Sequence, residues 1–439
     1  MADKPIRRKT QSLKLRDRQS ETTSKSQEGS LRGWDRAVHA VVQGAPVDRE
    51  RHQQMVSWHG WRIIMNPVWC YYGFILSVMA LCVFGLIMVF SSSTVDLIAQ
   101  GDNPWAQVLQ QGIFAILGLI AAIILSRISP DMLRGSSPIV LGVGLFLQTL
   151  TITGLGSAAG GNVGWIVIGP LRFQPAEILK WSLCVWMPYA LQLTRKNQHA
   201  GTIRQYAVPI VSFVAAFGAI MLGGDLGSAM ITVLIGAVAL FVGGFPLRWF
   251  VGLGVVGALG VVLVFVQGSS NRMNRILATY TECSGDDLQG LCYQAIHGNY
   301  ALASGGLTGV GLGNSREKWN YLPAAFNDFI FAVIGEELGF LGALAVIVLF
   351  IIMGWCLINI AMRHQNAYAR MVLMCIMVWL VGQGFINIAV VVGILPVMGL
   401  PLPFVSYGGT ALVMCLAAAG TAIAMARSQD EIRAATSKR

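Results

Sequence analysis

The stretch YYGFILSVMALCVFGLIMVF, residues 71–90, contains no charged side chain. A helix rises about 1.5 Å per residue and the hydrocarbon core of a bilayer is about 30 Å thick, so about 20 apolar residues suffice to cross it. Further apolar stretches recur, and the predicted spans are 71–90, 108–125, 139–155, 176–193, 208–222, 226–242, 250–266, 329–357, 371–395 and 404–426. This pattern predicts an all-α polytopic membrane protein with about ten transmembrane helices.

The composition favours the same fold class. Of the 439 residues, 55% are hydrophobic and 12% are charged, which is too apolar for one water-soluble core. Basic residues gather in alternate loops, as expected of the cytoplasmic side, and Arg172 is the one exception among the short loops. Both termini are therefore predicted to be cytoplasmic. The long loop 268–327, between the seventh and eighth helices, is predicted to be extracytoplasmic, and loops of that length are usually functional or disordered.

The two tails carry most of the net charge of +10. Residues 1–68 contain 13 basic and 7 acidic side chains, and residues 427–439 contain 4 and 2. Basic tails beside a membrane bind anionic headgroups, so no nucleic-acid partner is predicted. We expect 1–68 to be a largely disordered cytoplasmic tail, 69–426 to be the transmembrane domain and 427–439 to be a short cytoplasmic tail. Residues 34–61 are either an interfacial amphipathic helix or a plain linker.

Two of the eight cysteines, Cys283 and Cys292, lie in the long outer loop. They are close in sequence and on the oxidising side of the membrane, which predicts a disulfide between them. The other six fall in or beside apolar spans, where a thiol behaves as a small apolar group. His297 is the one nearby residue that could complete a metal site, and no cofactor is evident. Dependence on a divalent cation is left open.

Asp328 ends the polar segment GGLTGVGLGNSREKWNYLPAAFND, residues 305–328, and leads directly into an apolar span. A carboxylate at a membrane edge is costly unless it faces a cavity or a partner, so Asp328 is a candidate functional residue. The alternative is that Asn327 or Asp328 merely caps the next helix. Glu336 and Glu337 lie about 12–14 Å further along that helix, so we expect them deep in the membrane with structural partners. The glycines of 305–313 either permit a tight bend or bring backbone amides to an anion.

Four ordered motifs carry a resemblance to a known family. They are GNVGWIVIGPLRFQPAEILKW at 161–181, GGDLGS at 223–228, NDFIFAVIGEELG at 327–339 and NIAVVVGILPVMGLPLPFVSYGGT at 387–410. Together they resemble the SEDS family, the shape, elongation, division and sporulation proteins, over residues 67–427. Within it, KWNYLPAAFNDFIF and the cysteine pair are most similar to the FtsW type of actinobacteria, with the RodA type second.

This resemblance implies a peptidoglycan glycosyltransferase that polymerises lipid II at the outer face of the cytoplasmic membrane during cell division. Asp328 matches the family's essential aspartate and would be the general base for the acceptor's sugar hydroxyl, with polyprenyl pyrophosphate as the leaving group. A different class of function, transport of a lipid-linked precursor or a noncatalytic division scaffold, stays open. So does an elongation role of the RodA type.

Other polar residues in or near the motifs are candidates for substrate binding. Arg172 best suits the pyrophosphate, because a guanidinium matches phosphate oxygens with paired donors. Glu177 and Lys180 are three residues apart and can form an internal ion pair. Asp225 can cap a helix or pair with a cation. Four basic residues of the long loop either bind the pyrophosphate or are solvated surface charges, namely Arg272, Arg275, Arg316 and Lys318. Ser406 and Tyr407 either bind sugar or satisfy the backbone.

The sequence departs from the family pattern at five positions, which are Gly164, Asn320, Ala324, Phe326 and Met398. Since two of them replace common glutamates, no second catalytic carboxylate is predicted. The family also implies partners, namely a class B penicillin-binding protein as transpeptidase and other division proteins, and enrichment at the division septum. The chain has no penicillin-binding motif of its own.

Overall fold

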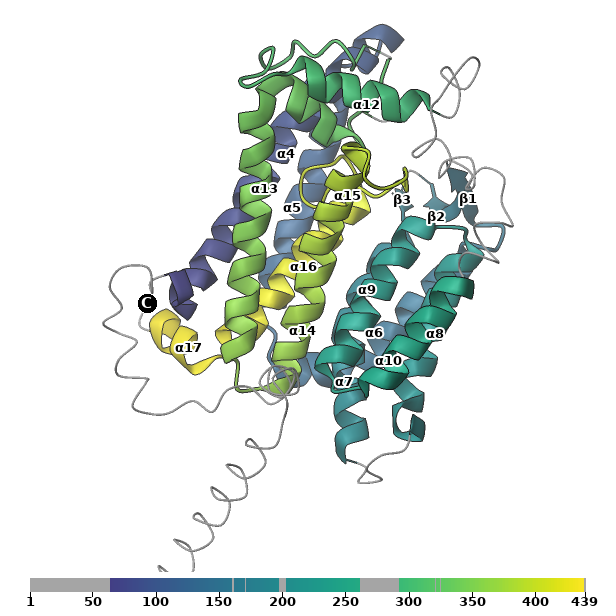
Figure 1. Cartoon of the computed structure of the whole chain (residues 1–439), viewed down its shortest axis with the longest axis vertical. Coiled ribbons are helices and arrows are strands. Elements are labelled where there is room, and N and C mark those ends of the chain that lie inside the picture. The colour runs from purple at the N-terminus through teal and green to yellow at the C-terminus, as the bar shows by residue number, and fades with distance from the viewer. Residues whose placement is uncertain are drawn as a thin grey trace, which may run out of the picture. The chain divides into compact units, whose positions relative to one another are not determined.

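The computed structural model describes residues 64–159, 162–169, 171–196, 203–260, 292–319, 321–323 and 325–437 (Figure 1). The elements in chain order are α4 (Pro67–Gln100), α5 (Ala106–Ser126), α6 (Pro130–Leu150), β1 (Gly156–Ala159), β2 (Asn162–Ile168), β3 (Leu171–Phe173), α7 (Pro175–Lys196), η3 (Ile203–Tyr206), α8 (Ala207–Leu222), α9 (Leu226–Val242), α10 (Leu247–Gly260), α12 (Tyr293–Ser304), α13 (Ile330–Arg363), α14 (Ala367–Met377), η6 (Val378–Gly382), α15 (Gln383–Val391), α16 (Gly409–Arg427) and α17 (Asp430–Ser437).

Polar caps and glycine set the ends of the apolar helices. The Asn66 side chain accepts a hydrogen bond from the N–H of Val68 at 2.9 Å, and Pro67 occupies the first turn of α4. The helix ends at Gly101, whose φ of 76° is left-handed and suits glycine. α4 therefore runs for 34 residues, well beyond the apolar stretch that predicted it.

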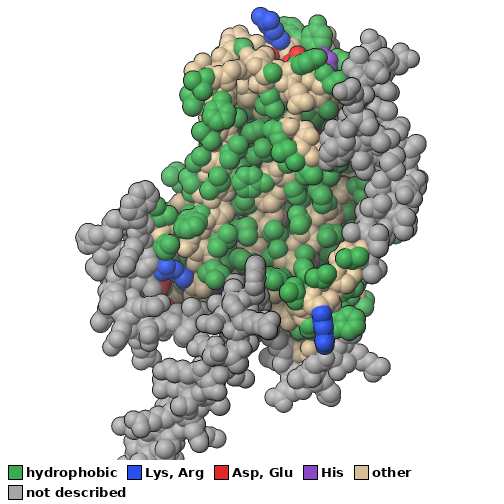
Figure 2. Space-filling view, viewed as in Figure 1, with side chains coloured by type: hydrophobic (Ala, Val, Ile, Leu, Met, Phe, Trp, Pro, Cys, Tyr) green, Lys and Arg blue, Asp and Glu red, His purple; other side chains and the backbone are tan. Residues whose placement is uncertain are grey.

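The helices pack lengthwise into one bundle. α4 packs along α13, α5 along α16 and α6 along α7, while α7 and α14 both contact α9. Hydrophobic side chains cover the middle of the surface and charged ones appear toward its ends (Figure 2). Large aliphatic residues such as Leu76, Ile139 and Leu222 are 70–71% exposed, as expected of side chains that face lipid.

Helices occupy most of each predicted span within the described residues. Six of them, α4, α5, α6, α13, the continuous α14–η6–α15 helix and α16, are long and apolar enough to cross a membrane, and α8 and α9 are shorter apolar helices. The polytopic membrane fold is therefore confirmed, whereas the number of ten crossings stays a prediction. Most of the tail 1–68 and the first part of the long loop lie outside the described residues.

One described segment between the helices forms strands, which the all-α prediction did not include. β1, β2 and β3 form a small antiparallel sheet, with Ser157 opposite Trp165 and Val167 opposite Arg172. Residues 162–168 alternate between two faces and include several β-branched side chains, which is the pattern of a strand. The sheet and α12 lie at the same end of the bundle, opposite α17 (Figure 1).

Glu336 and Glu337 lie just before a break in α13. Gly339, inside α13, has φ 68° and ψ −167°, which only glycine adopts readily, so the helix breaks there. The half-helix 330–338 precedes the break, and the backbone of residues 306–311 bonds to residues 336–341 beside it. The two glutamates therefore lie beside a part of the long loop, and their depth in the membrane stays a prediction. An apolar run read as one straight helix conceals the break at this glycine.

Candidate active site

Asp328 is half-buried in the turn that directly precedes α13. The N-cap residue of α13 is Phe329, so neither Asn327 nor Asp328 occupies the capping position. The Asp328 carboxylate faces the backbone of Gly399, because a Cβ built on that glycine would lie 3.6 Å from Asp328 Oδ2. The absent side chain at Gly399 leaves room beside the carboxylate.

Residues 396–408 form an irregular segment that lies between Asp328 and the start of α9. Gly399 faces Asp328, and the carbonyl oxygen of the neighbouring Met398 would lie 2.8 Å from a Cβ on Gly227, in the first turn of α9. Asp225 precedes that turn. The structure thus brings three of the four sequence motifs together around Asp328.

Asp225 is the N-cap residue of α9, and capping a helix is one of the two roles predicted for it. Its Oδ1 accepts a hydrogen bond from the N–H of Ser228 at 2.9 Å, and its Oδ2 accepts from Gln174 Nε2 at 2.8 Å. The N–H of Gln174 donates to Thr410 Oγ1 at 3.3 Å. Asp225 therefore ties the starts of α7, α9 and α16 together at this end of the bundle.

Arg172 lies on β3 with an exposed side chain. Its guanidinium carbon lies 4.5 Å from the centroid of the Trp165 ring on β2. A guanidinium in a cation–π contact can still donate N–H groups to an anionic ligand.

Glu177 and Lys180 form the predicted internal ion pair on α7, with Lys180 Nζ 2.7 Å from Glu177 Oε1. Both side chains are buried, and Lys180 also donates to Gln383 Oε1 at 3.0 Å. The ammonium lies over the Trp379 ring, 5.4 Å from its centroid. The π-helical segment η6, one wider turn, places Trp379 and Gln383 against the same lysine.

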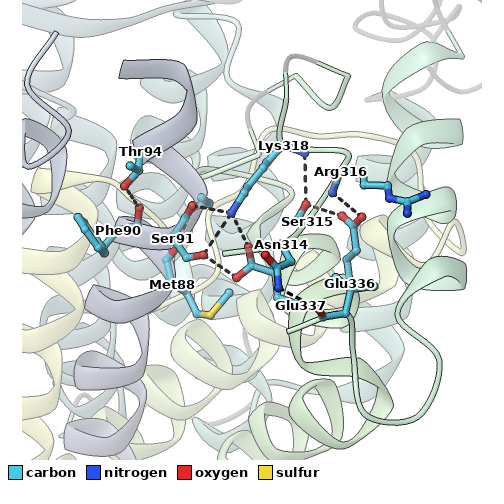
Figure 3. A network of polar contacts seen from close by, with 12 residues as sticks. Met88, Phe90, Ser91, Thr94, Asn314, Ser315, Arg316, Lys318, Glu336 and Glu337 are labelled. Carbon is cyan, nitrogen blue, oxygen red and sulfur yellow. Dashed lines mark hydrogen bonds and ion pairs between the residues drawn. The ribbon is translucent and has the colours of Figure 1, made fainter. Parts of the chain in front are cut away.

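Lys318 is buried in a polar network that joins the long loop to α4 and α13 (Figure 3). Its Nζ lies 2.7 Å from Glu337 Oε1 and donates to the carbonyl oxygen of Ser91 on α4 at 3.1 Å. The Ser91 hydroxyl donates to Glu337 Oε2 at 2.6 Å. The ammonium is therefore paired inside the protein and is not presented to solvent.

Glu336 holds the neighbouring part of the loop. Its carboxylate accepts hydrogen bonds from the Ser315 hydroxyl and, at 2.8 Å, from the N–H of Arg316 (Figure 3). The side chain of Arg316 is exposed. Glu336 and Glu337 thus have structural partners, as predicted, although these lie in the outer loop and on α4.

Two of the glycines of 305–313 pack directly on the half-helix. A Cβ on Gly305 would lie 1.9 Å from the carbonyl oxygen of Gly335, and one on Gly309 would lie 2.1 Å from that of Glu337. The N–H of Gly311 donates to the carbonyl oxygen of Glu337 at 3.0 Å. Close backbone approach explains Gly305 and Gly309, and the positive φ of Gly306, Gly311 and Gly313 agrees with the predicted bend.

The hydroxyls of Ser406 and Tyr407 are both bonded within the protein. Ser406 Oγ donates to the carbonyl oxygen of Asn327 at 2.6 Å and accepts from the N–H of Leu402 at 2.8 Å. Tyr407 donates to Gln110 Oε1 at 2.7 Å, and burial raises the pKa of its hydroxyl. Ser406 therefore satisfies backbone groups, which is one of its two predicted roles. Tyr407 instead links the irregular segment 396–408 to α5.

Sequence reasoning missed the buried amides that support the site. Gln383 and Asn387 lie four residues apart on α15, and their side chains bind the carbonyl oxygens of Pro401 and Leu400, respectively. Two amides at this spacing in an otherwise apolar predicted span were a readable signal, because buried amides in membrane helices need partners.

Three predicted residues fall outside the described part of the chain, namely Arg272, Arg275 and Cys283. Cys292, the predicted partner of Cys283, is disulfide-bonded. Among the described residues there is no group of three or more His, Cys, Asp or Glu side chains placed to hold a metal ion.

Comparisons with known proteins agree with this architecture. The sequence pattern of the FtsW, RodA and SpoVE family, described as cell cycle proteins, matches residues 72–431. Stage V sporulation protein E of Bacillus subtilis is 35% identical over 355 residues, which covers 80% of this chain and 96% of that protein. The probable peptidoglycan glycosyltransferase FtsW of Mycobacterium tuberculosis is 34% identical over 359 residues, 81% of this chain and 67% of that protein.

Two solved structures share the fold. A peptidoglycan synthase complex that coordinates polymerization and crosslinking contains a chain with a TM-score of 0.66 and 26% identity, covering 81% of this chain and 97% of that chain. The rod shape determining protein RodA of Thermus thermophilus gives a TM-score of 0.61 and 26% identity, covering 82% and 97%. The protein described here therefore belongs to the FtsW, RodA and SpoVE family of cell cycle proteins.

Proposed function

We propose that this protein is a peptidoglycan glycosyltransferase that polymerises lipid II at the outer face of the cytoplasmic membrane during cell division. The observation that carries the proposal is the half-buried carboxylate of Asp328, which faces the open backbone of Gly399 at the end of the bundle that also bears Arg172. The FtsW relatives carry the name of the same activity.

Asp328 is the general base of the proposed reaction. The hydroxyl oxygen of the acceptor sugar attacks the anomeric carbon of the donor while Asp328 takes the hydroxyl proton. The bond from that carbon to the polyprenyl pyrophosphate breaks, and the pyrophosphate leaves with the electron pair. The Asp328 carboxylate lies beside Gly399 on the irregular segment 396–408.

The leaving pyrophosphate needs positive charge, because its negative charge grows as the bond breaks. Arg172 and Arg316 are the predicted cations whose side chains are exposed among the described residues. Lys180 and Lys318 are buried and paired with Glu177 and Glu337. We therefore assign pyrophosphate binding to Arg172 first and Arg316 second, and structural roles to the two lysines.

The proposed setting is a two-protein machine at the division septum, with both termini of this chain in the cytoplasm. Its partner would be a class B penicillin-binding protein that crosslinks the new strand, together with other division proteins. The similar synthase complex supports a partnered assembly. An elongation role of the RodA type is the second candidate within the family, favoured by the similarity to Thermus thermophilus RodA.

Polymerisation of purified lipid II, with the cognate penicillin-binding protein present, tests the proposal. Wild type should make long glycans, and Asp328→Asn, which keeps the shape but cannot accept the proton, should make none. Asp131→Asn is the matched control, because Asp131 is an exposed aspartate in the first turn of α6. Movement of labelled lipid between leaflets without polymer would instead indicate a transporter, and neither activity would indicate a scaffold.

A further inference from the structure

Asn387 on α15 is buried, 1% exposed, and contacts the backbone of Asp328. Its Nδ2 donates one hydrogen bond to the carbonyl oxygen of Asp328 at 2.8 Å and another to that of Leu400 at 2.7 Å. An amide oxygen facing two carbonyl oxygens would be repelled by both, so the NH₂ group must point toward them. Both hydrogens of one side chain are thus used at the candidate active site.

The Asp328 turn is held at three consecutive carbonyl oxygens. Tyr407 donates its N–H to Phe326 at 2.9 Å, the Ser406 hydroxyl donates to Asn327 at 2.6 Å, and Asn387 donates to Asp328. All three donors come from residues 387–407. The backbone that carries the carboxylate is therefore fixed to this one part of the chain.

The second hydrogen bond of Asn387 holds the backbone that the Asp328 carboxylate faces. Leu400 follows Gly399, and Gly399 is the residue that lies opposite Asp328 Oδ2. Asn387 consequently joins the backbone that carries the Asp328 carboxylate to the backbone that this carboxylate faces. Gln383, one turn earlier, holds only the Pro401 carbonyl oxygen and contacts Lys180 at its own oxygen.

We propose that Asn387 is a positioning residue for the reaction. It sets the distance between the Asp328 carboxylate and the backbone at Gly399. The inference rests on the proposed function. A general base acts when its oxygen lies within about 2.6–3.2 Å of the atom that carries the proton. A displacement of about 1 Å costs about 100-fold in rate even when the substituted group does not touch the reacting atoms.

Steady-state polymerisation of lipid II by the complex with its penicillin-binding partner tests the assignment. For Asn387→Leu, which removes both donors at similar volume, we expect kcat to fall about 100-fold while KM stays within about threefold. Asn387→Ser, which can keep one donor and leaves a smaller side chain, should fall by about tenfold. Asn359→Leu is the matched control, because Asn359 donates to a helix carbonyl oxygen on an exposed face.

Gln383→Leu separates positioning from support of the fold, since it removes a buried amide from the same helix and the same segment without touching Asp328. The proposal requires a much larger fall in kcat for Asn387→Leu than for Gln383→Leu at an equal loss of thermal stability. Equal falls, or kcat within threefold of wild type for either Asn387 variant, would overturn it. If Asn387→Leu does not fold, Asn387→Ser decides by the same comparison. Failure of the proposed function looks different, because wild type would then make no polymer or Asp328→Asn would still make it.

Discussion

Breaking the buried pair between Lys318 and Glu337 should destabilise the protein, whereas removing both charges should not. The two side chains are 1% and 0% exposed and lie 2.7 Å apart. Lys318→Met leaves the Glu337 carboxylate buried without its cation, still accepting a hydrogen bond from the Ser91 hydroxyl, and such a loss costs about 3–5 kcal/mol. At roughly 2 °C per kcal/mol for a large domain, the apparent unfolding midpoint should fall by about 6–10 °C.

The double variant Lys318→Met/Glu337→Gln removes the charge and keeps an amide that can bond to Ser91. Its unfolding midpoint should return to within about 3 °C of wild type, because no charge stays buried without a partner. The assay is thermal unfolding of the purified protein in detergent at one heating rate. Arg134→Met is the control, since Arg134 forms an exposed pair with Asp131 that is worth less than about 1 kcal/mol.

The same variants decide whether Lys318 binds pyrophosphate. A lysine that only clamps the outer loop is dispensable once Glu337 is neutral, so the double variant should polymerise lipid II at close to the wild-type rate. A stable double variant without activity would refute the structural assignment. A double variant as unstable as Lys318→Met would refute the electrostatic reasoning.

Three further outcomes follow from single contacts. Gly339→Ala should prevent stable folding, measured as loss of monodisperse protein on size exclusion, because its φ is 68° and the new Cβ would lie 2.3 Å from the backbone nitrogen of Gly309. Arg172→Lys should raise KM for lipid II by about tenfold with kcat less affected, since an ammonium does not reproduce the edge of a guanidinium stacked on Trp165. Burial lowers the pKa of His364 in the folded protein, so protonation of this side chain opposes folding. The stability of the fold should be full above about pH 6.5, the ordinary pKa of histidine, and should fall as the pH drops below that value. The unfolding midpoint should be lower at pH 5.5 than at pH 8, and His364→Gln should lose that difference.

Local sequence patterns predicted the features that depend only on residues close in sequence, namely helices, caps and ion pairs within one helix. The apolar spans fall on helices, and the pair Glu177 and Lys180 forms because residues three apart share one face of a helix. The cap at Asp225 is local in the same sense. These features need no knowledge of how distant segments meet.

Contacts between distant segments could not be predicted in this way. Ser91 and Glu337 are 246 residues apart, and nothing in either local pattern indicates that a serine of α4 completes the Lys318 network. The break in α13 could not be predicted for a different reason. Hydropathy continues unchanged through Gly339, so a pattern of apolar residues cannot register a break in backbone direction there.

The placement of charge around Asp328 favours catalysis over transport. Two predicted cations, Lys180 and Lys318, each pair with a glutamate at 2.7 Å inside the protein. The backbone carbonyl oxygen of Asp328 accepts a hydrogen bond from the buried amide of Asn387, which fixes the backbone that carries the carboxylate. A general base must be held at a fixed position relative to the group that it deprotonates. A fixed backbone at Asp328, with two of the predicted cations already paired, suits proton abstraction better than movement of a lipid across the bilayer.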